Sequence, residues 1–140
     1  MFKILMCGDR DWTAPYPIKL ALKRHTAGKS KKDILVIHGG ARGADSIAGE
    51  EAKAMGLTVL VFPAQWDTYG RAAGPIRNTQ MLNEKPDLVL AFHNDLLASK
   101  GTKDMCRRAV RAGVKTWVTG IKFEEVHFEL TQAWFKALKA

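Results

Sequence analysis

The sequence predicts an α/β protein with a single Rossmann-like, doubly wound, mainly parallel sheet that carries helices on both faces. Short apolar runs alternate with longer amphipathic stretches along the chain. The runs are unbroken, which is typical of parallel strands covered on both faces. Glycine, proline or polar residues follow these runs, and ligands of such sheets bind at the carboxyl ends of the strands. The loops after the strands are therefore expected to carry the function.

Five strands and five helices are predicted in strict alternation, joined by right-handed crossovers. The strands are expected at residues 4–7, 34–37, 57–62, 88–92 and 114–118. Apolar side chains at helical spacing indicate helices over residues 18–25 and 44–55. Pro75 is expected at the first position of the third helix, and Thr102 is expected to cap the fourth. The last helix is predicted over residues 123–138.

The 140 residues are expected to form one domain, residues 1–140, because 46% of them are apolar and can build a sizeable core. Lys and Arg outnumber Asp and Glu by 22 to 14, and the net charge of +8 favours a phosphate-bearing partner. Without a membrane-spanning run or a signal-peptide cleavage site, the protein is expected to be cytoplasmic, with no membrane partner. Cys7 and Cys106 form no CxxC pair and the four histidines lack metal-ligand spacing. We therefore expect no disulfide scaffold, bound metal or cofactor.

A glycine-rich loop, GGARGAD at residues 39–45, joins the second predicted strand to the second helix. Glycines let the backbone approach a ligand, and a helix start offers free N–H groups to an anion. Arg42 could add a bidentate phosphate contact. We therefore expect a phosphate site, although the loop is neither a Walker A sequence nor GxGxxG. The alternative is a tight turn in which Asp45 caps the helix.

Three further loops end at the same edge of the predicted sheet. The first, GDRDW at residues 8–12, could place a guanidinium and an aromatic ring beside the glycine-rich loop. The loop at residues 63–73 carries aromatic side chains that could stack on a base or cover the core. The third, SKGT at residues 99–102, is a second candidate anion cradle, or a flexible loop with an ordinary cap. Arg77 and Asn78 are expected in the first turn of the third helix, facing this edge.

Together these segments resemble the YspA-like, cpYpsA-related branch of the SLOG superfamily. The resemblance rests on GDRxW at residues 8–12, HGGARGAD at 38–45, WxxxGxxAGPxRNxxM at 66–81 and SKGT at 99–102, within a match over about residues 3–118. It implies a Rossmann-like sheet that binds a nucleotide or a nucleotide-derived molecule, for example one like ADP-ribose, at its carboxyl edge. It also implies a homodimer, which relatives form through helices.

One group of relatives, the cytokinin-activating phosphoribohydrolases, cleaves the base from a nucleoside monophosphate. Its RKxxM stretch resembles RNxxM here and aligns Arg77 with the catalytic arginine of that group. Its PGGxGTxxE stretch is matched only by GT at residues 101–102, and Met105 occupies the position of the catalytic glutamate. Asp104 is adjacent, but one residue along a helix turns a side chain by about 100°. An N-glycosidic-bond hydrolase is therefore an alternative, with Arg77, Asp45 and Asp104 as candidate catalytic residues.

Another relative, DNA-processing protein A, binds single-stranded DNA. Its GxARGxD loop and its Arg-Asn pair resemble residues 39–45 and 77–78, so a single-stranded nucleic acid is an alternative partner. The main expectation is a domain that binds a nucleotide-derived ligand, as a sensor or as an enzyme, with Trp12, Trp66 or Tyr69 near the base. The expected binding residues are Gly8, Arg10, Trp12, Gly39, Gly40, Arg42, Gly43, Asp45, Arg77, Asn78, Ser99, Lys100, Gly101 and Thr102.

Overall fold

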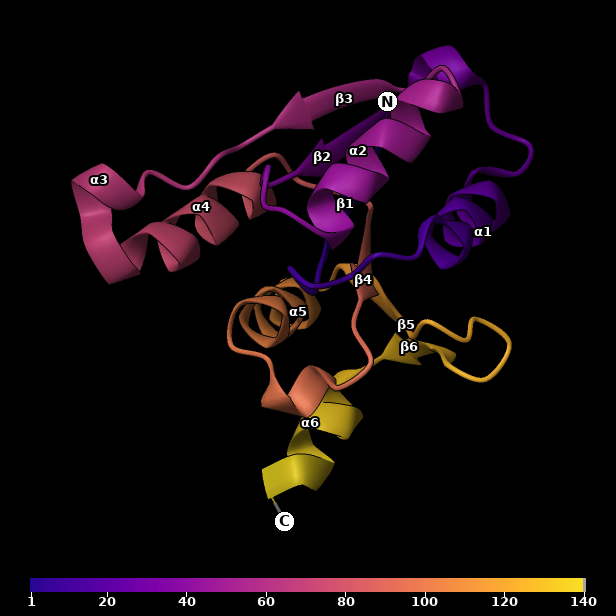
Figure 1. Cartoon of the computed structure of the whole chain (residues 1–140). Coiled ribbons are helices and arrows are strands. Elements are labelled where there is room, and N and C mark those ends of the chain that lie inside the picture. Colours follow the sequence, from indigo (N-terminus) through magenta and orange to yellow (C-terminus); the bar gives the residue numbers. More distant parts are fainter. Residues whose placement is uncertain (140) are drawn as a thin grey trace.

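The computed structural model describes residues 1–139, with side chains up to residue 137. A six-stranded sheet forms its centre, in the order β3-β2-β1-β4-β5-β6 (Figure 1). The first five strands are parallel, and the sixth pairs antiparallel with the fifth. The predicted doubly wound, mainly parallel fold is thereby confirmed. The strands are β1 (Phe2–Gly8), β2 (Ile34–His38), β3 (Thr58–Val61), β4 (Leu88–Phe92), β5 (Lys115–Thr119) and β6 (His127–Leu130).

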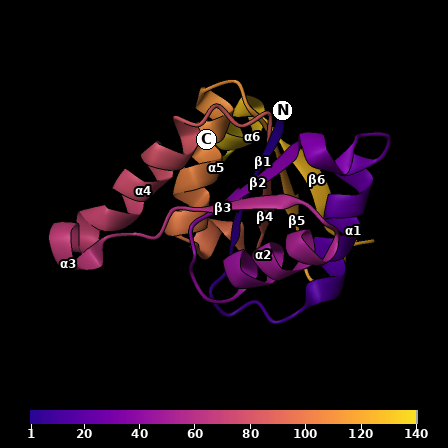
Figure 2. The ribbon, with the colours of Figure 1, turned by 90° about the horizontal axis from the view of Figure 1, so that it is seen from above.

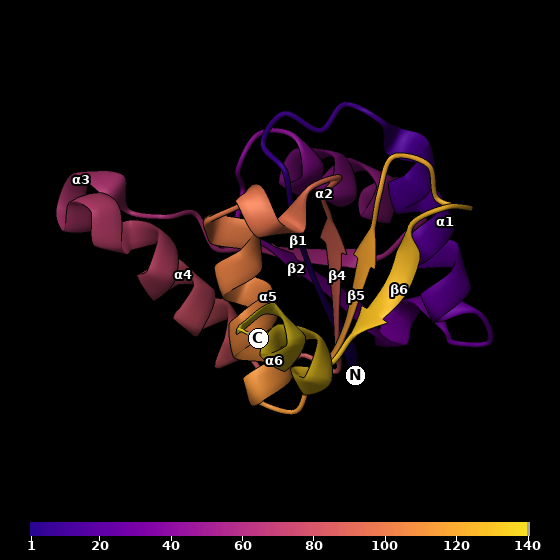
Figure 3. The same cartoon turned by 90° about the horizontal axis from the view of Figure 1, so that it is seen from below.

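Helices cover both faces of the sheet (Figures 2 and 3). They are α1 (Pro15–Thr26), α2 (Ala44–Ala54), α3 (Trp66–Tyr69), α4 (Ala73–Leu82), α5 (Gly101–Arg111) and α6 (Gln132–Lys139). In β1, Ile4 and Met6 join the apolar cluster under α1 and α2, whereas Leu5 and Cys7 join the cluster under α4, α5 and α6. The unbroken apolar sequence of β1 is thus explained by burial on both faces. None of the helices within residues 1–139 is long and apolar enough to cross a membrane.

The chain changes direction across the sheet between β1 and β4. From β1 it moves outward to β2 and β3, and it then returns to β4 and continues to β5 and β6. β1 and β4 stay paired to their carboxyl ends, where Gly8 lies beside Phe92. The loops that leave these ends lead to helices on opposite faces, and such a point opens a cleft for ligands in α/β sheets. The carboxyl edge between β1 and β4 is therefore where this fold is expected to bind a ligand.

The predicted helix over residues 123–138 is wrong in its first half, because β6 forms there and α6 begins only at Gln132. β6 pairs with β5 in the register Thr116 to Leu130 and Thr119 to His127. The pairing satisfies backbone groups along the outer edge of β5 that would otherwise need other partners. The spacing of apolar residues in this segment is compatible with a helix, and it contains no information about the pairing with β5 that makes residues 127–130 a strand.

The expected loop over residues 63–73 also differs, since it contains α3 and a 3-10 turn at Gly70–Ala72. Together with α4 it forms an arm that projects from the body of the molecule (Figure 1). Pro75 is the third residue of α4 and not the first. Arg77 and Asn78 consequently lie in the second turn of α4 and not in its first.

Candidate functional site

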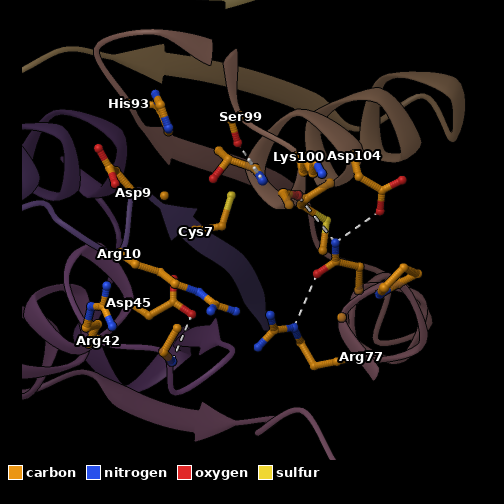
Figure 4. Close-up of a pocket in the computed structure, with 18 of the residues that line it drawn as sticks. Cys7, Asp9, Arg10, Arg42, Asp45, Arg77, His93, Ser99, Lys100 and Asp104 are labelled. Atoms are coloured by element: carbon orange, nitrogen blue, oxygen red, sulfur yellow. Dashed lines mark hydrogen bonds between the residues drawn. The ribbon is translucent and has the colours of Figure 1, made fainter. Parts of the chain in front are cut away.

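A cavity of about 900 Å³ opens at the carboxyl edge of the sheet between β1 and β4 (Figure 4). This volume lies within the range of pockets that hold small molecules and cofactors. Its walls come from the loops after β1, β2 and β4, from α3 and from the amino-terminal parts of α2, α4 and α5. The fold therefore brings together all of the loops in which functional residues were expected.

Most of the expected site residues line this cavity. They are Gly8, Arg10, Arg42, Asp45, Trp66, Arg77, Asn78, Ser99, Lys100, Gly101, Thr102 and Asp104, and Met105 lines it as well. Five others do not line it, namely Trp12, Gly39, Gly40, Gly43 and Tyr69. Trp12 is only 4% exposed, packs edge-on against Phe92, and donates its indole N–H to the carbonyl oxygen of Ala14. Its place is in the core and not beside a base.

The loop after β1 follows a tight path that directs Arg10 over the cavity. A Cβ atom at Gly8 would collide with the carbonyl oxygen of Phe92 and would lie 2.7 Å from the Cβ atom of Ala44, so only glycine fits. The Arg10 guanidinium lies 5.5 Å from the ring centroid of Trp66, a cation–π contact. This contact links the β1 loop to the arm that carries α3.

Three N–H groups at the start of the glycine-rich loop donate to acceptors within the protein. Those of Gly39 and Ala41 donate to Oδ2 of Asp45 at 3.0 and 3.3 Å, and that of Gly40 donates to Nδ1 of His38 at 3.0 Å. A phosphate could use these donors only by displacing Asp45 and His38. The loop thus differs from the open cradle that was expected.

Arg42 and Gly43 contribute to the cavity in different ways. The Arg42 side chain is 74% exposed and forms an ion pair with Asp11 at 3.2 Å, so it lies at the rim. Gly43 has a φ of +77°, and a Cβ atom there would collide with the backbone of Asp9 and Arg10. Gly43 therefore lets the β1 and β2 loops pack together but does not face the cavity.

Asp45 lies in the first turn of α2 and caps the preceding loop, whereas the sequence suggested that it caps the helix. Its side chain is buried, and burial raises the pKa of this carboxyl to about 6. The Arg77 guanidinium and the N–H groups of Ala41 and Gly39 oppose this rise. A carboxyl group with such a pKa can exchange a proton near neutral pH, so Asp45 stays a candidate acid or base.

A chain of hydrogen bonds orients Arg77. Its Nη1 donates to the carbonyl oxygen of Gly39 at 2.8 Å, and its Nε donates to Oδ1 of Asn78 at 3.3 Å. The Asn78 amide donates in turn to Oδ2 of Asp104 at 3.1 Å (Figure 4). Arg108 donates to the same oxygen at 2.9 Å. Asp104 is thus already engaged as an acceptor, which makes it a poor candidate for catalysis.

The start of α5 forms another wall. Oγ of Ser99 accepts the N–H groups of Thr102 at 3.1 Å and Lys103 at 3.4 Å, so Ser99 and not Thr102 caps the helix. Lys100 is exposed and lines the cavity beside this cap. Met105 is 1% exposed within the apolar cluster below, so its thioether supplies packing and no acid–base group.

Nine lining residues were not among the expected site residues, namely Cys7, Asp9, Asp11, Ala41, Arg71, Gly74, Pro75, Met81 and His93. Two of them, His93 and Cys7, have side chains whose protonation is fixed by their surroundings. His93 directly follows β4, a position that could have identified it, and its Nδ1 accepts the N–H of Asp95 at 2.9 Å. The neutral ring therefore carries its proton on Nε2. Cys7 is the other, and its hydrogen bond with Cys106 together with burial raises the pKa of its thiol well above the usual value. Cys7 consequently stays protonated and is not an activated nucleophile.

The cavity holds cations that have no carboxylate partner. Arg42 pairs with Asp11 and Asp104 pairs with Arg108. Four other lining cations, Arg10, Arg71, Arg77 and Lys100, form no ion pair with any carboxylate in the part of the chain with described side chains. Unpaired cations that converge on a cavity favour an anionic ligand. Over residues 1–139, no cluster of three or more His, Cys, Asp or Glu side chains could hold a metal ion.

The chain is similar in sequence to known proteins. A sequence model of the "YspA, cpYpsA-related SLOG family" matches residues 2–69, which include β1, the glycine-rich loop and α3. The chain is also similar to the Gene 61 protein of Mycobacterium phage D29, with 34% identity over 119 residues. That match covers 81% of this chain and 93% of the phage protein. No solved structure matches the chain significantly.

Proposed function

Because the chain belongs to the YspA, cpYpsA-related SLOG family, we propose that it binds a nucleotide or a nucleotide-derived ligand in the cavity between β1 and β4. Family membership suggests nucleotide-related binding or processing in general. The observation that carries the finer proposal is the convergence of four unpaired cations, Arg10, Arg71, Arg77 and Lys100, on a cavity of nucleotide size at the switch point of the sheet.

The cavity offers distinct groups for the parts of such a ligand. Arg77 and Lys100 would bind phosphate, because a guanidinium and an ammonium form charge-assisted hydrogen bonds with phosphate oxygens. Trp66, with Arg10 above it, would flank the base. Asp45 would accept a hydrogen bond from a ribose hydroxyl. A ligand with phosphate, ribose and base, such as ADP-ribose, fits this set of groups.

A ligand panel and three variants test this proposal. Isothermal titration of the whole chain with AMP, ADP, ADP-ribose and unphosphorylated adenosine should show tighter binding of the phosphorylated compounds. Arg77→Gln should weaken their binding by about 1.5–3 kcal/mol, roughly 10- to 150-fold, because it removes a charged donor. Arg42→Ala should have a smaller effect, since the Arg42 side chain is exposed and already paired with Asp11.

Lys19→Gln, an exposed change on α1, is the matched control for lost positive charge and should leave ligand affinity unchanged. Thermal unfolding of each variant shows whether the fold is intact. The proposal is wrong if no phosphorylated compound binds, or if folded Arg77→Gln binds the panel as tightly as the unaltered chain does.

A further inference from the structure

A second groove, of about 470 Å³, lies between α5 and α6. These two helices lie side by side on the same face of the sheet (Figure 3). No residue lines both this groove and the nucleotide cavity, so α5 presents different side chains to each. Among the residues with described side chains, four cations border the groove and no Asp or Glu lines it. Those cations are Lys103, Arg107, Arg111 and Lys136.

Three of these cations form one stripe along α5. Lys103, Arg107 and Arg111 are each four residues apart, which places them on one face of the helix about 6 Å apart along its axis. The ion pair within α5 is formed by Arg108 and Asp104, on another part of the helix surface. Like charges at this spacing repel one another. An anionic partner along the stripe would relieve that repulsion.

The floor of the groove is apolar. It contains Leu97, Val110 and Phe135, and the Leu97 side chain is 50% exposed. The Arg107 guanidinium lies 5.9 Å from the ring centroid of Phe135, so aromatic surface and charge are in contact here. An apolar floor with a polar rim is typical of surfaces that bind a protein partner.

We propose that the groove between α5 and α6 binds an acidic amphipathic segment of a partner protein. Its apolar side chains would pack on Leu97, Val110 and Phe135, and its carboxylates would pair with the cations of the rim. A nucleic-acid backbone would satisfy the cations but would leave the apolar floor uncovered, so the groove favours a peptide. This proposal is independent of the nucleotide site.

The probe is a designed, fluorescein-labelled peptide of about four helical turns, with leucines on one face and glutamates on the other. Its affinity for the whole chain is measured by fluorescence anisotropy near physiological ionic strength. Arg107→Glu with Arg111→Glu should weaken binding about tenfold or more, because two attractive contacts become repulsive. Leu97→Ser should weaken it several-fold, because part of the apolar floor is lost.

Lys19→Glu with Lys23→Glu is the matched control. This control changes the net charge by the same amount as the double variant at Arg107 and Arg111, and its two residues are also four positions apart. Lys19 and Lys23 are exposed on α1, which covers the opposite face of the sheet. This variant should bind the peptide like the unaltered chain, and a scrambled peptide of identical composition should bind weakly. If the double variant at Arg107 and Arg111 fails to fold, the peptide affinities of the single variants Arg111→Glu and Lys23→Glu are compared instead, because both residues are exposed.

Four results would overturn the proposal. They are no detectable binding of the designed peptide, equal weakening by the two charge-reversed variants, equal binding of the scrambled peptide, and displacement of the peptide by a single-stranded oligonucleotide that binds more tightly under the same conditions. The nucleotide titration separates this proposal from the proposed function. The groove variants should retain nucleotide affinity, and Arg77→Gln should retain peptide affinity.

Discussion

Asp45 occupies the place that an anion would take in the glycine-rich loop. Its Oδ2 accepts the N–H groups of Gly39 and Ala41, and the Arg77 guanidinium lies close enough to lower its pKa. Burial outweighs these favourable interactions and raises the pKa of the carboxyl to about 6. Ionisation of Asp45 therefore lowers the free energy of unfolding, and replacement of Asp45 by a side chain that does not titrate should remove this loss of stability.

We predict that Asp45→Asn changes how stability depends on pH. The pKa of Asp45 is higher in the folded chain than its usual 3.8, so between about pH 4 and pH 6 the folded state binds more protons than the unfolded state. The free energy of unfolding should therefore fall as pH rises through this window, by about 3 kcal/mol at most. Asparagine keeps the acceptor oxygen but does not titrate. Urea unfolding measures the free energy of unfolding of both proteins at pH 4 and pH 7. The difference between Asp45→Asn and the unaltered chain should shift in favour of the variant from pH 4 to pH 7. An equal change with pH in both proteins would contradict the raised pKa of Asp45.

Met105 leads to a prediction about catalysis. The resemblance to the phosphoribohydrolases aligns it with their glutamate, and the neighbouring Asp104 is engaged by Asn78 and Arg108. Asp45 is the remaining candidate carboxyl, so we expect AMP to release adenine far more slowly than the ~1–10³ per second of ordinary enzymes. Chromatography of the reaction mixture measures this rate. Turnover at ordinary rates would show that the chain is a hydrolase, and Asp45→Asn would then test which carboxyl acts.

At the scale of elements, β6 is held to α1 through aromatic and histidine side chains. His127 stacks between Trp117 and Phe123, with ring centroids 4.6 and 4.4 Å away. Its Nε2 lies 3.4 Å from Nε2 of His25 on α1, and its Nδ1 lies 2.7 Å from Oγ1 of Thr119. The two facing Nε2 atoms can share one proton, but protonation of both rings would place two N–H groups against each other. The packing of β6 should therefore weaken in acid.

We predict that His127→Gln reduces the loss of stability in acid. Burial, followed by the charges of His25 and Arg24, lowers the pKa of His127 to about 4, and burial, Arg24 and Lys115 lower that of His25. The unfolded chain thus binds more protons than the folded chain between about pH 6.5 and pH 4, and stability is lost as pH falls through this window. Urea unfolding at pH 7 and pH 4.5 should show a shallower loss in the variant. An NMR titration of His127 with an ordinary midpoint would contradict this explanation.

The elements that could be predicted are those whose burial is visible in a short window of sequence. Residues 4–7 of β1 and the whole of β4 are continuous apolar runs, and the loops after the strands contain many of the residues that line the cavity. β6 could not be predicted, because it exists through pairing with β5 and its own sequence has no clear alternation. The inward-facing N–H groups of the glycine-rich loop were also missed, since they depend on how Asp45 folds back from α2. Local sequence pattern therefore indicated which loops line the cavity, and tertiary contacts determine how each of these residues is engaged there.

At the scale of the whole molecule, the surplus of positive charge is spread over several surfaces. Lysines 19 and 23 lie on α1, and lysines 29, 31 and 32 lie in the turn before β2. That turn is at the amino edge of the sheet, opposite the cavity at the carboxyl edge. Other cations line the groove between α5 and α6. The net charge of +8 therefore does not form one continuous track for a nucleic-acid strand.

This distribution predicts how ligand affinity depends on salt. Binding of a single strand should change with salt by a log–log slope of about −0.7 for each phosphate neutralised. Because few cations converge at the cavity, a mononucleotide should lose little affinity between low and physiological salt, and an oligothymidylate should bind weakly and nearly dissociate there. Titrations of both ligands at several salt concentrations measure these slopes, with Arg77→Gln as the variant that should weaken the mononucleotide. A tight complex with a steep slope, whose affinity grows with oligonucleotide length, would instead identify single-stranded nucleic acid as the ligand, because only a long strand engages cations beyond the cavity.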